Sequence, residues 1–172
     1  MNTRYFLALS LVAIVISTAE SARLETETSN SLVHNPLAGF ERLIGGQWHL
    51  EGSYQEFEWG AGQLSVKAKS YFLVGGEPRL VSQGIWLWQP EAKEVRGIFT
   101  AVGMPVELFE YTTHLKSDSI VSDLAAYSSE GLRTEYTESW QFFDDTHFEW
   151  TLFAKTPDGP QKEMGGIYTR KE

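Results

Sequence analysis

From Gln47 onward, apolar and polar residues alternate with a period of two, the pattern of strands that have one dry face and one wet face. The alternation is clearest in residues 132–143 and 146–155. In these segments the apolar positions of one face are Leu132, Tyr136, Trp140 and Phe142, and then Phe148, Trp150 and Leu152. Asp144-Asp145 lies between the segments and predicts a tight hairpin turn.

Seven further segments have the composition of strands and are separated by short turns rich in Gly, Pro, Asp and Ser. They are Gln47–Trp59, Leu64–Val74, Arg79–Gln89, Glu94–Val102, Val106–Leu115, Ile120–Tyr127 and Lys162–Arg170. Short connections imply antiparallel neighbours, because parallel strands need long crossovers. We therefore predict an all-β fold, an antiparallel up-and-down meander of about 8–10 strands closed into a barrel. The alternative is a β-sandwich, which usually shows longer Greek-key connections.

A short helix is expected before the first strand. Pro36 is followed by Leu37, Phe40, Leu43 and Ile44, at the spacing of three and four that marks one face of a helix. Proline is favourable at the first helical position, and Gly45-Gly46 predicts the end.

The first 22 residues have the pattern of a secretory signal peptide. One basic residue, Arg4, precedes an apolar run from Tyr5 to Ile16, and small residues follow. The run is too short to span a bilayer comfortably, although an uncleaved anchor is the alternative. We predict a signal peptide at 1–22, a flexible polar lead-in at 23–35 and one barrel domain at 36–172. The protein is expected to be exported, periplasmic or secreted, without stable membrane insertion after cleavage.

Composition narrows the choice of partners. Asp and Glu total 23 against 14 Lys and Arg, for a formal net charge of -9. Such an acidic chain repels phosphate backbones, so no nucleic-acid partner is expected. The chain contains no cysteine, and the core alone must hold the fold together. This favours a bacterial exported protein, since small secreted eukaryotic domains tend to be rich in disulfides.

Two separated motifs carry a family resemblance. Gly46-Gln47-Trp48 follows the expected helix, and Arg170 lies near the end of the last expected strand. In this arrangement the chain resembles the calycin superfamily of lipocalins, fatty-acid-binding proteins and their bacterial relatives. The resemblance implies that Trp48 plugs one end of the barrel and that Arg170 packs across it, as structural closure rather than as ligand groups.

The likeness covers about residues 37–171 and is closest to an uncharacterised bacterial family of lipocalin-like domains. Residues 87–97, with Pro90 in a turn, resemble that family's strand-turn-strand unit. The segment Asp144-Asp145-Thr146-His147 resembles its late acidic hairpin.

Aromatic residues are the first candidates for a binding site. The wall of an interior pocket for a flat or apolar molecule would be formed by Trp86, Trp88, Trp140 and Trp150. The alternative is that these tryptophans simply fill the core or plug the ends of the barrel.

Three polar residues are candidates for orienting a ligand, and each has two possible orientations. Arg96 enters the interior if Ile98 and Val102 point inward, but Val95, Gly97, Phe99 and Ala101 form an equally apolar face. Glu110 and His114 share one face with Val106 and Leu108, whereas Phe109, Tyr111 and Leu115 form the competing apolar face.

No cofactor is expected. None of the four histidines has metal-ligand spacing to another. Heme-binding barrels of the nitrobindin type use a single histidine, and His114 or His147 could be proposed, but the local motif does not match.

Catalytic motifs are also absent from the sequence: it contains no nucleophile elbow, phosphate-binding loop or cysteine nucleophile. The sequence therefore favours an exported binding protein for a small apolar or amphiphilic molecule. An isomerase or hydrolase on the same barrel and a filled barrel serving as a structural or interaction module are the alternatives.

Overall fold

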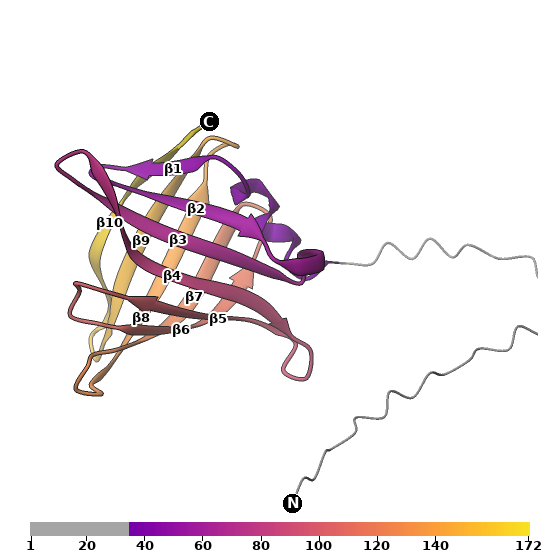
Figure 1. Cartoon of the computed structure of the whole chain (residues 1–172). Coiled ribbons are helices and arrows are strands. Elements are labelled where there is room, and N and C mark those ends of the chain that lie inside the picture. Colours follow the sequence, from indigo (N-terminus) through magenta and orange to yellow (C-terminus); the bar gives the residue numbers. More distant parts are fainter. Residues whose placement is uncertain (1–34) are drawn as a thin grey trace, which may run out of the picture. The chain divides into compact units, whose positions relative to one another are not determined.

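The computed structural model describes residues 35–172 (Figure 1). The predicted signal peptide and nearly all of the predicted lead-in lie outside these residues. A 3-10 helix η1 (Ala38–Leu43) is followed by ten strands and a second short 3-10 helix, η2 (Ala61–Gln63). The strands are β1 (Gln47–Leu50), β2 (Ser53–Trp59), β3 (Ser65–Val74), β4 (Glu77–Gln89), β5 (Glu94–Ala101), β6 (Leu108–Leu115), β7 (Ser119–Tyr127), β8 (Arg133–Phe142), β9 (His147–Thr156) and β10 (Gly159–Lys171).

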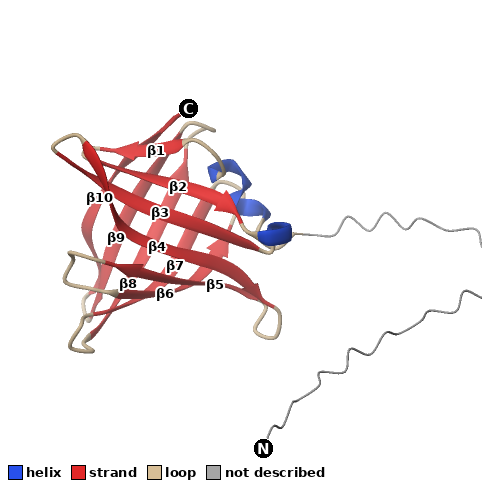
Figure 2. Ribbon diagram, in the orientation of Figure 1, coloured by secondary structure: helices blue, strands red, loops and turns tan. Residues whose placement is uncertain are grey.

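The ten strands form one closed barrel in which each strand pairs antiparallel with its neighbour in sequence (Figure 2). The barrel closes where β1 pairs with β10, with Trp48 directly opposite Arg170. The predicted all-β, up-and-down closed meander is therefore confirmed. Short turns dictate this topology, because each strand can only reach an antiparallel neighbour.

One predicted strand is two strands in the structure. The segment expected to run unbroken from Gln47 to Trp59 turns at Glu51-Gly52, and β1 pairs with β2 across that turn. Gly52 has a φ of +71°, a left-handed conformation that glycine adopts without steric cost. Only the short polar group Glu51-Gly52-Ser53 marks this turn in the sequence, and the strand prediction ran through it.

The helix η1 closes one end of the barrel, and we call this the capped end. The helix was expected near Pro36 to Ile44, and it is of the 3-10 type. Phe40 and Leu43 of the helix, and Leu37 just before it, are almost completely buried. The Phe40 ring centre lies 5.1 Å from that of Trp86, so the helix packs directly onto the aromatic interior. The opposite end, which carries the turns at 51–52, 75–76, 128–132 and 157–158, we call the far end.

Arg170 joins the last strand to the capped end. Its guanidinium donates hydrogen bonds to the backbone carbonyl oxygens of Ile44 (2.6 Å), Gly45 (3.0 Å) and Arg42 (3.3 Å). The Trp48 indole Nε1 donates to the carbonyl oxygen of Leu43 at 2.9 Å. These bonds satisfy carbonyls at the end of η1 that would otherwise have no partner.

Candidate functional site

The inward face of each strand follows from the register. Cα partners in an antiparallel pair point to the same side of the sheet, so the burial of Trp48 and Phe57 fixes the interior face around the barrel. All four predicted wall residues, Trp86, Trp88, Trp140 and Trp150, point inward by this criterion.

Trp86 and Trp140 meet in the middle of the barrel. Their ring centres are 5.8 Å apart with the planes at 89°, an edge-to-face contact. Both indoles are almost fully buried, and Phe57 packs against each of them. Trp86 and Trp140 are therefore part of the packed core of the barrel.

Room for these rings comes from two inward-facing glycines. A Cβ atom on Gly97 would lie 2.6 Å from Cδ1 of Trp86, and one on Gly84 would lie 2.3 Å from the Phe99 ring. Such distances are impossible for real carbon atoms, so these positions must lack a side chain for the aromatic cluster to pack.

Arg96 lies on the outer face of the barrel. Its guanidinium donates to Thr112 Oγ1 at 2.8 Å and pairs with Glu94 at 2.6 Å. The inward face of β5 is the other one considered in the sequence, with Val95 and Phe99 buried. Of the two orientations that the sequence leaves open for Arg96, the structure has the outward one, so Arg96 is not an interior ligand group and its exposed guanidinium keeps its hydration.

Glu110 and His114 also lie on the outer face. Glu110 is exposed and accepts a hydrogen bond from the hydroxyl of Tyr127 at 2.8 Å. The inward residues of β6 are Phe109, Tyr111, Thr113 and Leu115, as the register with β5 and β7 requires. Of the two faces that the sequence leaves open for this strand, the more apolar one points inward, so Glu110 and His114 do not form an interior pair.

The interior instead contains Glu138, which the sequence reasoning missed. This residue lies on β8 between Tyr136 and Trp140, and all three share the inward face. Its side chain is 8% exposed, and Oε1 accepts a hydrogen bond of 2.6 Å from Nε1 of Trp150 on the neighbouring strand. The signal was present in the sequence, because Glu138 occupies the same parity as the apolar residues of that segment.

Burial changes the ionisation of this carboxyl group. Loss of hydration raises the pKa of Glu138 from 4.5 to about 7, although the indole N–H groups of Trp150 and Trp140 favour the charged form. None of the ion pairs found among residues 35–172 includes Glu138. The interior therefore contains a carboxyl that titrates near neutral pH without a basic partner among these pairs.

Polar groups surround Glu138 on several strands. Ser122 lies directly across from it on β7 and shares a buried hydrogen bond of 2.9 Å with Thr113 of β6. The pKa of Tyr111 and that of Tyr168 are both raised. Burial of the phenol is the larger cause, and the nearby charge of Glu138 is the second. These neighbours are hydrogen-bond donors at neutral pH, and none is a cation.

Two buried donors lack partners. The indole Nε1 atoms of Trp86 and Trp140 are fully buried and make no hydrogen bond. The Trp140 N–H is near enough to Glu138 to lower the pKa of that group, but its geometry does not make a hydrogen bond. A buried donor without an acceptor costs about 1–3 kcal/mol, so this part of the interior is not fully satisfied by the protein.

The barrel interior is packed unevenly along its axis. Near the capped end the inward side chains of Trp48, Phe148 and Val66 are fully buried, whereas Trp59, Trp88 and Leu115 beside the turns are half-buried. From the level of Glu138 toward the far end, inward side chains on β6, β8 and β9 retain accessible surface. They are Phe109, Tyr111, Tyr136, Trp150, Leu152 and Ala154. An inward-facing side chain stays accessible only where protein atoms do not fill the interior, so this half of the barrel is incompletely filled beside β6, β8 and β9. Leu124 and Ala126, inward on β7 at the same levels, are buried.

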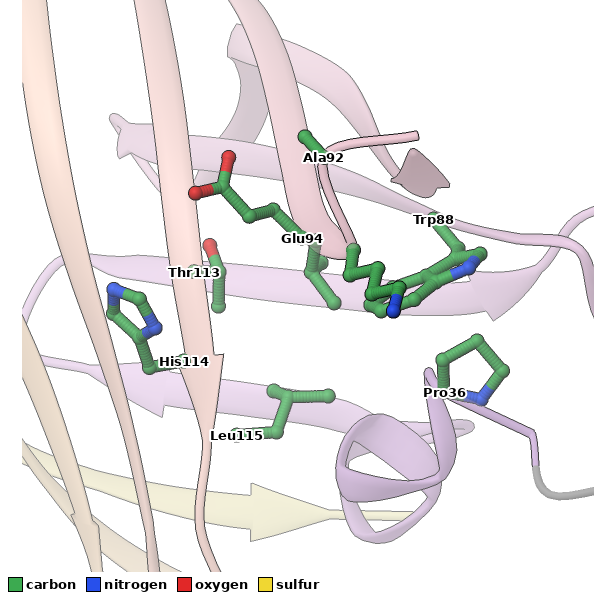
Figure 3. Close-up of a pocket in the computed structure, with 9 residues that line it drawn as sticks. Pro36, Trp88, Ala92, Glu94, Thr113, His114 and Leu115 are labelled. Atoms are coloured by element: carbon green, nitrogen blue, oxygen red, sulfur yellow. The ribbon is translucent and has the colours of Figure 1, made fainter. Parts of the chain in front are cut away.

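A separate cleft of about 670 Å³ lies at the capped end, beside β5 and β6. Trp88 and Pro36 line one side of it and His114 the other, as Figure 3 shows. Trp88, although inward-facing, therefore borders this cleft at the capped end. It does not contact the Glu138 group, and the cleft does not bring Trp88 together with Trp140 or Trp150.

His147 and the other possible metal ligands of residues 35–172 lie apart from the interior group around Glu138. His147 lies at the hairpin after β8, where its Nδ1 is 3.2 Å from Asp144 Oδ1. In residues 35–172, no three His, Cys, Asp or Glu side chains are grouped so that they could hold a metal ion. That part of the chain also contains no helix long and apolar enough to cross a lipid bilayer.

Comparison of the sequence with known protein families finds no match, and comparison with curated proteins finds none either. The function must therefore be argued from the barrel itself.

Proposed function

We propose that the protein binds a small apolar or amphiphilic molecule in the far half of its barrel. The observation that carries this proposal is the uneven interior, filled by aromatic side chains at the capped end and accessible around Tyr111, Trp150 and Leu152. A ligand in that space would bury apolar surface, at about 25 cal/mol per Å². Its polar group would meet Glu138, which fixes its orientation.

The calycin likeness favours the same function. A closed ten-strand antiparallel meander with Trp48 facing Arg170 at its closure is compatible with that superfamily, whose members bind small ligands inside the barrel. A signal peptide at 1–22 and an exported location, as the sequence predicts, would suit a carrier or scavenger of such molecules.

Mass spectrometry under native conditions tests the proposal. Protein purified from its own host should carry a small molecule whose mass is lost on denaturation. Ala154→Trp would fill the far half from an inward position of β9 and should abolish the retained mass. Lys155→Trp adds the same ring to the outer face of that strand and should leave it unchanged. Equal retention in both variants would place the ligand elsewhere, and an empty wild-type protein would favour the filled-barrel alternative.

A catalytic role is the second candidate, because a general acid or base works best with a pKa near the working pH. Glu138, with its pKa raised to about 7 by burial, meets that condition. The recovered molecule decides between the two functions: a binding protein returns it unchanged after incubation, whereas an enzyme converts it at a rate that Glu138→Gln abolishes.

A further inference from the structure

We propose that the ligand of the far half is an organic cation, an amphiphilic amine or quaternary ammonium compound whose charged group lies against Glu138. This inference deepens the proposed function and rests on it. It names the chemical class of the ligand from the groups that surround the one inward-facing carboxyl found on β8.

The first argument is charge. Glu138 is inward-facing and 8% exposed, with one hydrogen bond, from Trp150 Nε1 at 2.6 Å. A carboxylate can accept about four hydrogen bonds, so acceptor capacity remains. Buried carboxylates are normally paired with a cation, and no ion pair among the described residues supplies one here. A ligand cation would complete the site.

The second argument is the aromatic surroundings. Trp140 and Trp150 are Cα partners on β8 and β9, and both lie one inward position nearer the capped end than Glu138 and its partner Leu152. Tyr168 packs 6.5 Å from Trp150 between ring centres, in an edge-to-face contact. The faces of Trp and Tyr rings attract ammonium groups, and aromatic cages with a nearby acid are a common solution for binding them. A fatty-acid carboxylate would instead meet a like charge.

The third argument is the charge of the whole chain. The formal net charge of -9 favours the approach of cations over anions. The apolar part of the ligand would then extend toward the far end, past Tyr136, Leu152 and Ala154, which retain accessible surface on the inward face.

The pH dependence follows from the groups that face Glu138. Tyr111 of β6 and Tyr168 of β10 both have a pKa raised above the usual 10, so they stay neutral below pH 9. Ser122 of β7 and Leu152 of β9, directly opposite Glu138, do not titrate. Between pH 6 and pH 8, Glu138 itself is therefore the facing group that changes charge.

Calorimetric titrations with three probes of equal chain length test the inference: decyltrimethylammonium, 1-decanol and decanoate. The ammonium compound should bind at least tenfold more tightly than the other two at pH 8. Its affinity should fall about tenfold from pH 8 to pH 6, because the ionised fraction of Glu138 falls by that factor. Glu138→Gln should remove both the preference and the pH dependence. Glu135→Gln, which changes an exposed carboxylate of the same strand, should alter neither.

The outcomes separate the inference from the proposed function. Equal binding of the ammonium compound and decanol, or tighter binding of decanol at pH 6 than of the ammonium compound at pH 8, would overturn the cation assignment and leave the binding function in place. Failure of all three probes would count against both. The probe preference and its pH dependence are measured on the wild-type protein, so they decide the inference even if Glu138→Gln does not fold.

Discussion

The guanidinium of Arg170 lies over the indole of Trp48, with its central carbon 5.4 Å from the ring centre. The two residues are also direct partners in the β1–β10 pair that closes the barrel. Arg170 thus combines a cation–π contact with three hydrogen bonds to the backbone of residues 42–45. Residues more than 120 positions apart in sequence are joined at this point.

Replacing Arg170 should destabilise the fold. Arg170→Ala removes the hydrogen bonds and the ring contact, and it leaves partly buried carbonyls without donors. We expect a loss of about 2–4 kcal/mol in the free energy of unfolding, measured by urea denaturation. Arg170→Lys keeps the charge but lacks the planar fork, and it should lose about half as much. A wild-type midpoint in Arg170→Ala would show that the closure does not depend on this side chain.

Gly97 should tolerate no side chain. In Gly97→Ala the new Cβ would lie 2.6 Å from Trp86, and the indole must move out of a packed cluster. Overpacking of this kind costs about 1–3 kcal/mol, which thermal or urea unfolding would detect. Ile98→Thr changes the adjacent, half-exposed outer position and should stay within about 0.5 kcal/mol of the wild type. Equal effects of the two substitutions would contradict the inward assignment of Gly97.

Glu138 should make stability fall as pH rises. Burial raises the pKa of this acid from 4.5 to about 7, so the folded state holds the proton more tightly than the unfolded chain. The contribution of Glu138 to the stability of the folded state is therefore fully present below pH 4.5 and is lost as the pH rises through 7. Between pH 5 and pH 8 the loss is about 2.5 kcal/mol.

Urea denaturation of wild type and Glu138→Gln at pH 5 and pH 8 measures this contribution. From pH 5 to pH 8 the free energy of unfolding of the wild type should fall by about 2.5 kcal/mol relative to that of Glu138→Gln, because glutamine has no proton to lose. Glu135→Gln serves as the exposed control and should parallel the wild type. Parallel curves for all three proteins would mean that Glu138 titrates as an ordinary surface acid.

Much of the fold could be predicted from alternation and turn chemistry. The closed meander and the pairing of Trp48 with Arg170 at its closure both agree with the structure. The hairpin at Glu51-Gly52 was missed because the three polar residues 51–53 were its only signal. Which face of β5 and β6 turns inward could not be decided locally, because both faces of these strands carry apolar residues.

The site was harder to predict because a side chain's environment depends on strands distant in sequence. Arg96, Glu110 and His114 were candidates because they are polar residues on partly apolar faces, yet all three lie on the outer face of the barrel. Glu138 was overlooked, although it interrupts an apolar face between Tyr136 and Trp140. Its importance comes from Trp150, Tyr111 and Tyr168, which only the closed barrel brings around it.

The most direct test of ligand binding in the far half is the indole N–H region of a ¹⁵N NMR spectrum. During titration with the three ten-carbon probes, the Trp140 and Trp150 signals should shift, because these indoles adjoin Glu138. The Trp48 signal should stay in place, since its N–H is bonded to Leu43 at the capped end. Shifts confined to Trp88, which borders the cleft at the capped end, or no indole shift with any probe, would contradict binding in the far half of the barrel.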